Sequence, residues 1–255
     1  MQINFSRIVD LSVPIEATPS ERVPVSIRYV QHNEGAREMS RVFGVSATDL
    51  PGSAGWAGEE LRLISHAGTH VDAPWHYAPQ SAGRAAEKID ELPLSWFIGP
   101  GTVIDLSHKA CDSDIAIDDL EKGIAKSGAT LTAGSIVMIY TGASNYWGSE
   151  EYPTHGAGLT AEAVLWLCRQ GICVIGTDAF SLDAPFEVMK RRFAESNDPG
   201  VIWPAHFAGR ETPYCQIEKL MNLDRLPPSG FWAACFPVKI AKASAAWTRA
   251  VAFVP

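Results

Sequence analysis

The chain has 255 residues, of which 46% are hydrophobic and 20% are charged, and its formal net charge is −8 at pH 7. This composition is that of an ordinary globular protein and excludes a disordered chain, and the length suits one large domain. The negative charge excludes a general electrostatic attraction to nucleic acid or to an anionic membrane, and no segment rich in Lys and Arg provides a local exception.

The cysteines and the hydrophobic segments indicate the compartment. Five cysteines are scattered without a CxxC pair, which argues against a disulfide scaffold and against a zinc knuckle. Residues 1–14 lack the basic and apolar regions of a secretory signal, and no run of about 18 apolar residues suits a membrane span. We therefore expect a cytoplasmic protein.

The predicted elements alternate only in part between strands and helices. The apolar runs predict strands at residues 8–13, 61–66, 102–106, 135–140, 173–176, 231–240 and 249–254. Helices are predicted at residues 118–126, with Asp118 as N-cap, and at 160–170, with Thr160 as N-cap and Gly171 beyond the end. The order predicts one α/β domain over residues 1–255, with a mixed sheet and not a regular doubly wound one.

Residues 15–60 differ from the rest of the chain. They are rich in Pro, Gly, Ser and Glu and show no steady hydrophobic period. Such a segment predicts a long loop with short strands, of the kind that often forms a lid over a site.

Four possible metal ligands fall within eleven residues of one another: His66, His70, Asp72 and His76. On a straight strand, His66 and His70 would lie about 13 Å apart at Cα, too far for one ion. Gly68 between them permits a bend, whereas the β-branched neighbours and Pro74 argue against a helix. The sequence therefore predicts an irregular, glycine-bent segment at the end of a strand.

Two imidazoles and a carboxylate are ligands typical of zinc, manganese or iron, and three protein ligands leave positions for water and substrate. Such an ion would lower the pKa of water to about 7 and polarise a carbonyl. His76, four residues past Asp72, could turn back to the same cavity as a general base or acid. A single histidine is more often an ordinary surface residue or a hydrogen-bonded core residue, but four ligand-type residues so close in sequence favour a metal site.

The pattern His66-x-Gly-Thr-His70-x-Asp72-x-Pro-x-His76 resembles the HxGTHxDxPxH signature of the cyclase-like metal-dependent hydrolases, which include bacterial kynurenine formamidase and isatin hydrolase. Further segments are similar to the same family and extend the likeness over nearly the whole chain: residues 10–14, 176–185, 214–226, 236–240 and 249–252. The resemblance implies a single domain of the swivelling β/β/α type.

The resemblance also implies roles for individual residues. His66, His70 and Asp72 match metal ligands, and His76 matches the catalytic histidine. His206 matches a histidine that binds a second ion in dinuclear zinc formamidases, and with one metal it would instead act in proton transfer.

Two residues of the segment 214–226 are candidates for the last metal ligand, and the sequence does not decide between them. Glu218 matches the acidic residue of the formamidases, and Gln216 matches a glutamine ligand of the isatin hydrolase branch, which uses one manganese. An extended backbone would direct both side chains to the same side, whereas a helix would separate them by about 200°.

Other polar residues have an ordinary structural interpretation beside the functional one. His32, His108 and His155 lie in polar segments and are expected at the surface. Asp178 and Asp183 would either accept a hydrogen bond from a ligating imidazole or cap turns.

Three residues are candidates for contact with the substrate. Trp75 and Trp56 lie inside and before the motif and could stack on an aromatic ring, although most tryptophans are core or interface residues. Arg210 could bind a product carboxylate, although a surface ion pair is the more ordinary role.

The resemblance implies hydrolysis of an amide C–N bond, and residues 176–186 and 214–220 are more similar to the isatin hydrolase branch. We therefore expect a small aromatic cyclic amide such as isatin as substrate, Mn²⁺ as cofactor with Zn²⁺ as the alternative, and a homodimer or homotetramer. The alternatives are aryl formamide hydrolysis, lactone hydrolysis and a non-catalytic metal-binding module.

Overall fold

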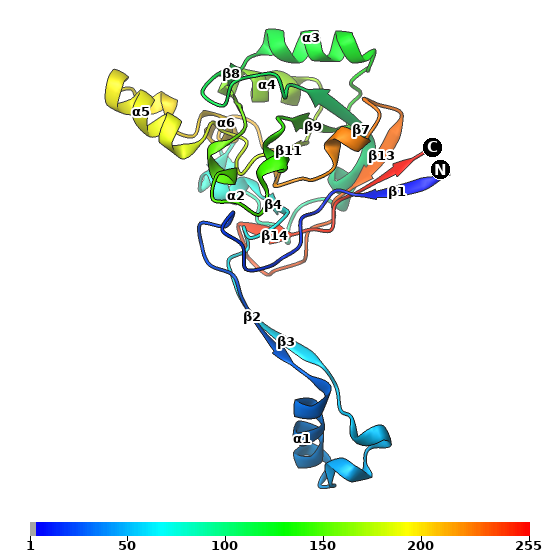
Figure 1. The fold of residues 1–255 in the computed structure, drawn as a ribbon. Helices are drawn as coiled ribbons and strands as arrows, with labels where there is room; N and C mark the ends of the chain where they lie inside the picture. The colour runs from blue at the N-terminus through cyan, green and yellow to red at the C-terminus, as the bar shows by residue number, and fades with distance from the viewer. Residues whose placement is uncertain (1–3) are drawn as a thin grey trace.

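One nine-stranded mixed sheet forms the centre of the protein in the computed structural model, which describes residues 4–255 (Figure 1). The strands lie in the order β1 (Arg7–Asp10), β15 (Val251–Val254), β13 (Phe231–Ala234), β7 (Ile98–Asp105), β9 (Ile136–Tyr140), β11 (Val174–Thr177), β12 (Cys215–Glu218), β4 (His70–Asp72) and β14 (Ala245–Trp247). The predicted α/β class with a mixed sheet is confirmed. Residues 1–3 of the predicted domain lie outside the described part of the chain.

The four middle strands β7, β9, β11 and β12 run parallel, and the outer strands pair antiparallel. Parallel neighbours need crossover connections, and helices provide them. In sequence, α3 (Ile117–Ser127) lies between β7 and β9, α4 (Ala161–Arg169) between β9 and β11, and α5 (Phe186–Ser196) and α6 (Pro204–Ala208) between β11 and β12. The helices α3 and α4 cover one side of the sheet (Figure 1).

The sheet separates two apolar clusters because successive strand residues point to opposite sides. In β9, Ile136 and Met138 belong to one cluster and Val137 and Ile139 to the other, and all four are fully buried. The smaller elements are α2 (Pro74–Tyr77), β5 (Gln80–Ser81), β6 (Arg84–Ala85), β8 (Asp114–Ile115) and β10 (Gly158–Leu159). No helix of the described residues has the length and apolar character needed to cross a bilayer.

Most of the predicted strands and both predicted helices are confirmed, with small shifts at their ends. The N-cap of α4 is Thr160, whose hydroxyl accepts from the Ala163 N–H at 3.1 Å, as expected. The N-cap predicted for α3 is wrong: it is Ala116, whose N–H donates to the Asp119 carboxylate at 2.9 Å. The strand predicted at 231–240 ends at Ala234, and the helices α5 and α6 were not predicted.

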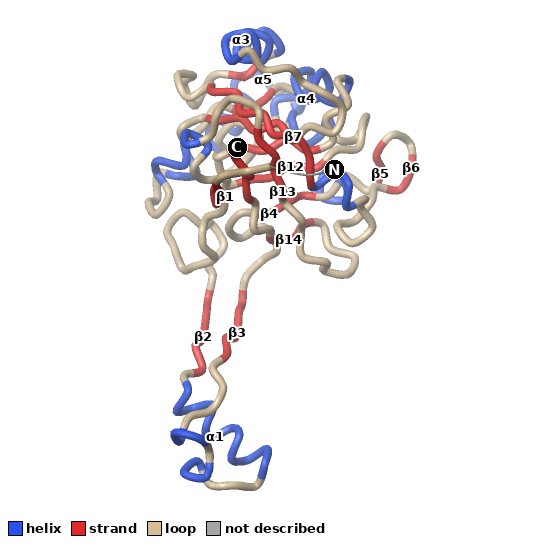
Figure 2. The backbone as a smooth tube through the Cα atoms, turned by 90° about the vertical axis from the view of Figure 1, so that its right-hand side faces the viewer, coloured by secondary structure: helices blue, strands red, loops and turns tan. Residues whose placement is uncertain are grey.

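The prediction for residues 15–60 is confirmed for the short strands, but it missed a helix. Strand β2 (Ser26–Val30) pairs with β3 (Gly58–Arg62), and α1 (His32–Phe43) lies between them. We call residues 26–62 the arm, which extends away from the body of the protein instead of covering it (Figures 1 and 2). The strand predicted at 61–66 lies earlier in the chain than predicted, because β3 ends at Arg62 and pairs within the arm.

The close packing around Gly158 provides a test of the fold. A Cβ at this position would lie 1.9 Å from the Ala184 backbone nitrogen, whereas a Cβ at Gly58 would meet nothing within 4 Å. We expect Gly158→Ala to lower the free energy of unfolding by about 1–3 kcal/mol, because backbone must move to make room. Urea denaturation measures this, with Gly58→Ala as the matched control. Equal stability of the two variants would contradict the packing.

Candidate metal centre

The segment from His66 to His76 passes through three local conformations. His66 lies in a turn, His70 and Asp72 lie on β4, and His76 lies on the short helix α2. Gly68 adopts a positive φ of 62°, which glycine tolerates without strain. The predicted glycine-bent segment at a strand end is therefore confirmed. Because of this bend, the His66 and His70 side chains lie close together, with 5.1 Å between their ring centres.

Asp72 lies at the centre of the cluster and is completely buried. Its Oδ1 lies 2.8 Å from His66 Nδ1 and 3.4 Å from His70 Nε2, and its Oδ2 lies 4.0 Å from His76 Nε2. The carboxylate thus contacts or faces all three histidines of the motif.

The strand β12 brings the second group of candidate ligands. It pairs antiparallel with β4, so that Gln216 lies opposite Asp72 and Glu218 lies opposite His70. Because the segment is extended, both side chains point to the same side of the sheet. Glu218 Oε2 lies 3.5 Å from His70 Nε2, and the Gln216 amide lies 3.5 Å from Asp72 Oδ2.

His206 approaches the cluster from α6. Its Nε2 lies 3.9 Å from Asp72 Oδ2 and 3.7 Å from Glu218 Oε1. Its Nδ1 contacts the carboxylate of Asp183, which also accepts from the Ala205 N–H at 2.7 Å and so fixes the imidazole. Asp183 therefore has the imidazole-orienting role considered for it.

Asp178 has the alternative role, that of capping a turn. Its carboxylate accepts from the N–H groups of Thr141, at 2.7 Å, and Ser144, at 3.1 Å, and from both hydroxyls, so it fixes a turn.

The cluster has the donor atoms that a divalent cation needs. His70 Nε2 and Gln216 Oε1 are buried polar atoms without a hydrogen-bond partner in the described residues, and the one near polar contact there of the buried Asp72 Oδ1 at normal hydrogen-bond distance is with His66 Nδ1, at 2.8 Å. Unpaired buried polar atoms are rare, and here two of them lie beside a buried carboxylate. Two ligand sets have atoms within 4.8 Å of one another: His66, Asp72 and His76, and His70, Asp72 and Glu218. Imidazole, carboxylate and amide groups fit a divalent cation.

Burial sets the protonation states around this cluster. It lowers the pKa of the His70 imidazole to about 3 and that of His76 to about 4. Burial, together with the neighbouring Asp72 carboxylate, raises the pKa of Glu218 to about 7. Burial also opposes ionisation of Asp72, but the nearby histidines outweigh it and lower the pKa of that carboxyl. At neutral pH, His70 and His76 thus have free nitrogen lone pairs.

A buried ion pair supports the turn that contains His66. The Lys219 Nζ donates to Glu21 Oε2 at 2.7 Å and to the His66 carbonyl at 2.8 Å. The other oxygen of Glu21 accepts from the Gly68 N–H at 2.7 Å. Sequence analysis did not find this pair, and the only available signal was that Lys219 directly follows Glu218. Lys219 adopts a positive φ of 60°, which directs its side chain away from the strand it follows.

A cavity of about 260 Å³ opens onto the cluster. Part of its lining comes from the cluster itself. The other lining residues are Glu21, Arg22, Val23, Ile64, Phe180, Ser181, Phe186, Trp203 and Lys219. The guanidinium of Arg22 lies 4.6 Å from the centre of the Phe186 ring. Trp203 stacks on His206 at 4.2 Å between ring centres. None of these aromatic residues was singled out from the sequence, because they come from segments far from the motif.

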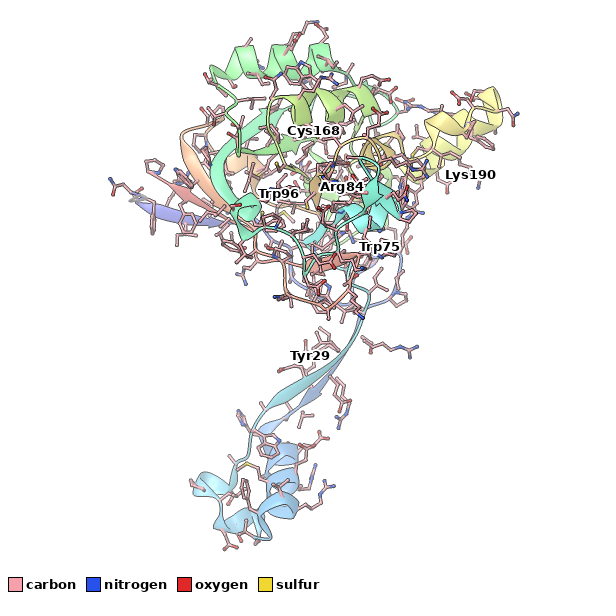
Figure 3. All side chains as sticks on the ribbon, turned by 180° about the vertical axis from the view of Figure 1, so that it is seen from behind. Tyr29, Trp75, Arg84, Trp96, Cys168 and Lys190 are labelled. Atoms are coloured by element: carbon pink, nitrogen blue, oxygen red, sulfur yellow. The ribbon has the colours of Figure 1, made fainter. Side chains whose placement is uncertain are left out.

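Several candidates from the sequence lie elsewhere. Trp56 is on the arm, and Trp75 is on the body with Lys88 over its ring (Figure 3); neither lines the cavity. Arg210 lies over the Phe207 ring and is also outside the cavity lining.

The three remaining histidines lie away from the cluster. His32 and His108 are exposed, as expected. His155 is partly exposed and stacks on the exposed Tyr146 at 3.5 Å between ring centres, so it also lies at the surface.

Known proteins resemble this chain in sequence. The model of the Cyclase family, described as "Putative cyclase", matches residues 9–184. A kynurenine formamidase of Salinibacter ruber is 30% identical over 192 residues, which cover 75% of this chain and 77% of that protein. An isatin hydrolase of Roseibium aggregatum is 28% identical over 202 residues, which cover 76% of this chain and 73% of that protein.

Solved structures share the fold. An isatin hydrolase bound to the product analogue thioisatinate matches with a TM-score of 0.76 at 24% identity, over 97% of this chain and 92% of that one. Isatin hydrolase A from Ralstonia solanacearum also gives a TM-score of 0.76 at 24% identity, over 98% and 92%. Because the family model matches more than half of the chain, and because its relatives are hydrolases, the chain is a hydrolase of the Cyclase family.

Proposed function

We propose that this protein hydrolyses the amide C–N bond of a small aromatic cyclic amide, opening the ring to a carboxylate as in the conversion of isatin to isatinate. The observation that carries the proposal is the convergence of unpaired ligand atoms beside the neutral His76, in a small cavity with aromatic walls. The likeness of fold to an isatin hydrolase bound to a product analogue agrees with it.

We assign one Mn²⁺, with Zn²⁺ as the alternative, to His66, His70, Asp72 and Gln216. A divalent cation at this place supplies a Lewis acid that polarises a carbonyl and promotes ionisation of water. Glu218 lies beside His70 and would be available to accept hydrogen bonds or to complete the site. Its Oε1 accepts a hydrogen bond from the Leu182 N–H at 3.1 Å, which fixes the carboxylate.

His76 is the proposed general base. Its neutral Nε2 accepts a proton from the water that attacks the amide carbonyl, so that a C–O bond forms. The C–N bond then breaks, and the same imidazole returns the proton to the leaving nitrogen. His206, held by Asp183, would keep a proton near the cluster, because that carboxylate raises the pKa of the imidazole against the effect of burial.

The second candidate is hydrolysis of an aryl formamide such as N-formylkynurenine. Two observations favour it: the 30% identity to a kynurenine formamidase, and the position of Arg22 in the cavity lining. A guanidinium at this place would bind a substrate that carries its own carboxylate.

Direct assay of the Mn²⁺-loaded protein on isatin, N-formylkynurenine and a dienelactone tests the proposal. We expect isatin to be opened with the highest kcat/KM, because it presents a flat aromatic amide to the aromatic walls of the cavity. Cleavage of N-formylkynurenine alone would replace the cyclic amide by the aryl formamide, and cleavage of the lactone alone would favour a lactone hydrolase. Full metal occupancy without turnover of any substrate would indicate a non-catalytic binding module.

The assignment of the last ligand has its own test. We expect Gln216→Ala to weaken Mn²⁺ binding by about 100-fold and Glu218→Gln to weaken it by less than about tenfold. Elemental analysis and metal titration measure both, and the native chain is expected to contain one ion. Two ions per chain, with both lost in Glu218→Gln, would exclude the single-ion assignment.

The role of His76 predicts both a rate and a pH profile. His76→Ala should lower kcat by about 10²- to 10⁴-fold with unchanged metal content. Burial lowers the pKa of His76 from 6.5 to about 4, so the base stays neutral as the pH falls and is protonated only near that value. The acid limb of kcat/KM should therefore lie near pH 4. An acid limb near 6.5, or an active His76→Ala, would remove His76 from this role.

Lys219 is a proposed positioning residue for His66. Lys219→Met leaves the buried Glu21 carboxylate without its partner, and we expect metal affinity to fall by about 10- to 100-fold as the turn shifts. The matched control is Lys109→Met, which breaks the 2.6 Å pair with Asp119 far from the cluster. Metal titration compares the two variants. An equal effect of both on stability, with metal affinity unchanged in both, would show that Lys219 is only structural.

A further inference from the structure

Tyr77 is a buried residue that directly follows His76 and that the sequence analysis did not single out. It ends the short helix α2, and only 3% of its surface is exposed. It is not among the residues that line the metal cavity, so its hydroxyl does not contact a substrate bound there. A buried tyrosine hydroxyl needs hydrogen-bond partners, and both of its partners here are main-chain groups of candidate metal ligands.

The Tyr77 hydroxyl bridges the two strands that form the candidate metal centre. It donates to the Asp72 carbonyl oxygen at 3.3 Å and accepts from the Gln216 N–H at 3.1 Å. Asp72 on β4 and Gln216 on β12 lie opposite each other in the antiparallel pair. The hydroxyl therefore joins the main chains of two residues, one from each strand, whose side chains both belong to the cluster.

The Tyr77 ring contacts α6, the third element of the centre, which lies close to α2 (Figure 1). It is perpendicular to the His206 imidazole at 5.4 Å between ring centres, and it stacks on Tyr214 at 5.2 Å. The Tyr214 hydroxyl donates to the Ala205 carbonyl of α6 at 2.8 Å. A Cβ at Gly209, just past the end of α6, would lie 2.3 Å from Cδ2 of the Tyr77 ring. The ring is thus enclosed on the side of α6.

Metal ligands must be held accurately, because the distances between a ligand atom and its ion vary by only about 0.2 Å. The contact between the Asp72 and Gln216 side chains is weak, since Gln216 Nε2 lies 3.5 Å from Asp72 Oδ2. Gln216 Oε1 has no hydrogen-bond partner in the described residues. The side chains alone therefore do not fix the two ligands relative to each other, whereas the Tyr77 bridge fixes their main chains.

A purely structural role is the ordinary interpretation of a buried tyrosine, and Tyr152 is an example of it. Tyr152 is also fully buried, and its hydroxyl donates to the Asp178 carbonyl at 3.0 Å. Its partner belongs to a residue that caps a turn and does not line the cavity. Tyr77 differs because both of its partners are candidate ligands and because its ring contacts His206.

We propose that Tyr77 is a positioning residue of the metal centre. Its hydroxyl sets the spacing between Asp72 and Gln216, and its ring holds the imidazole of His206. The proposal rests on the assignment of one ion to this cluster under the proposed function. It makes metal affinity depend on a side chain that touches neither the ion nor the substrate.

Titration of Tyr77→Phe with Mn²⁺ tests the proposal, because this variant keeps the ring and removes only the hydroxyl. We expect the affinity for Mn²⁺ to fall by about 10- to 100-fold. The electron paramagnetic resonance spectrum of the bound Mn²⁺ should also change, because it reports the symmetry of the ligands. Gly209→Ala keeps the hydroxyl but pushes on the ring, and it should weaken Mn²⁺ binding as well.

The matched control is Tyr152→Phe, which removes a hydroxyl that is equally buried. Urea denaturation should show a comparable loss of stability in both phenylalanine variants, whereas the affinity and the spectrum of bound Mn²⁺ should stay native in Tyr152→Phe. Native Mn²⁺ affinity in Tyr77→Phe would overturn this proposal alone, as would an equal loss of affinity in both variants. A native chain that binds no Mn²⁺ would overturn the ion assignment of the proposed function, and this proposal with it.

Discussion

The antiparallel pairing of β4 with β12 is the constraint on which the rest of the site depends. Its register places Gln216 opposite Asp72 and Glu218 opposite His70, so four polar side chains share one side of two neighbouring strands. A shift of β12 by one residue would turn Gln216 and Glu218 to the opposite face, away from His70 and Asp72. Hydrophobic contacts therefore fix the polar cluster: Val71 and Ile217, which lie between these residues, point into the core and hold the register.

This arrangement brings Asp72 and Glu218 together in a buried place, where two carboxylates repel each other and lack water. A cation at the cluster would offset both effects and would stabilise the folded chain by mass action. The surrounding residues prepare the cluster from several directions. Asp183 orients His206, and the ion pair of Glu21 and Lys219 holds the turn around Gly68. The histidines are consequently fixed in place by contacts that do not depend on an ion.

The sequence allowed the central part of this site to be predicted and left out its surroundings. The density of histidines located the segment, and Gly68 indicated the bend, because both signals are local. Glu21, Arg22 and Trp203 contribute through tertiary contacts between distant segments, which no local pattern encodes. The arm was missed for a different reason: Gly35 lies inside α1 and weakens the helical signal there, while its value lies in close packing against Trp56.

The backbone of Lys219 has a consequence for how this protein can change. Trp203 and Lys219 both border the cavity with positive φ values, 56° and 60°, which cost about 1–2 kcal/mol for residues with a Cβ. Glycine would relieve this backbone strain at either position, but it would remove the side chain that stacks on His206 or the one that pairs with the buried Glu21 and holds the turn of His66. The strained backbone is therefore kept for the contacts of these two side chains, and their retention in a homologue would be a sign that the site is still in use.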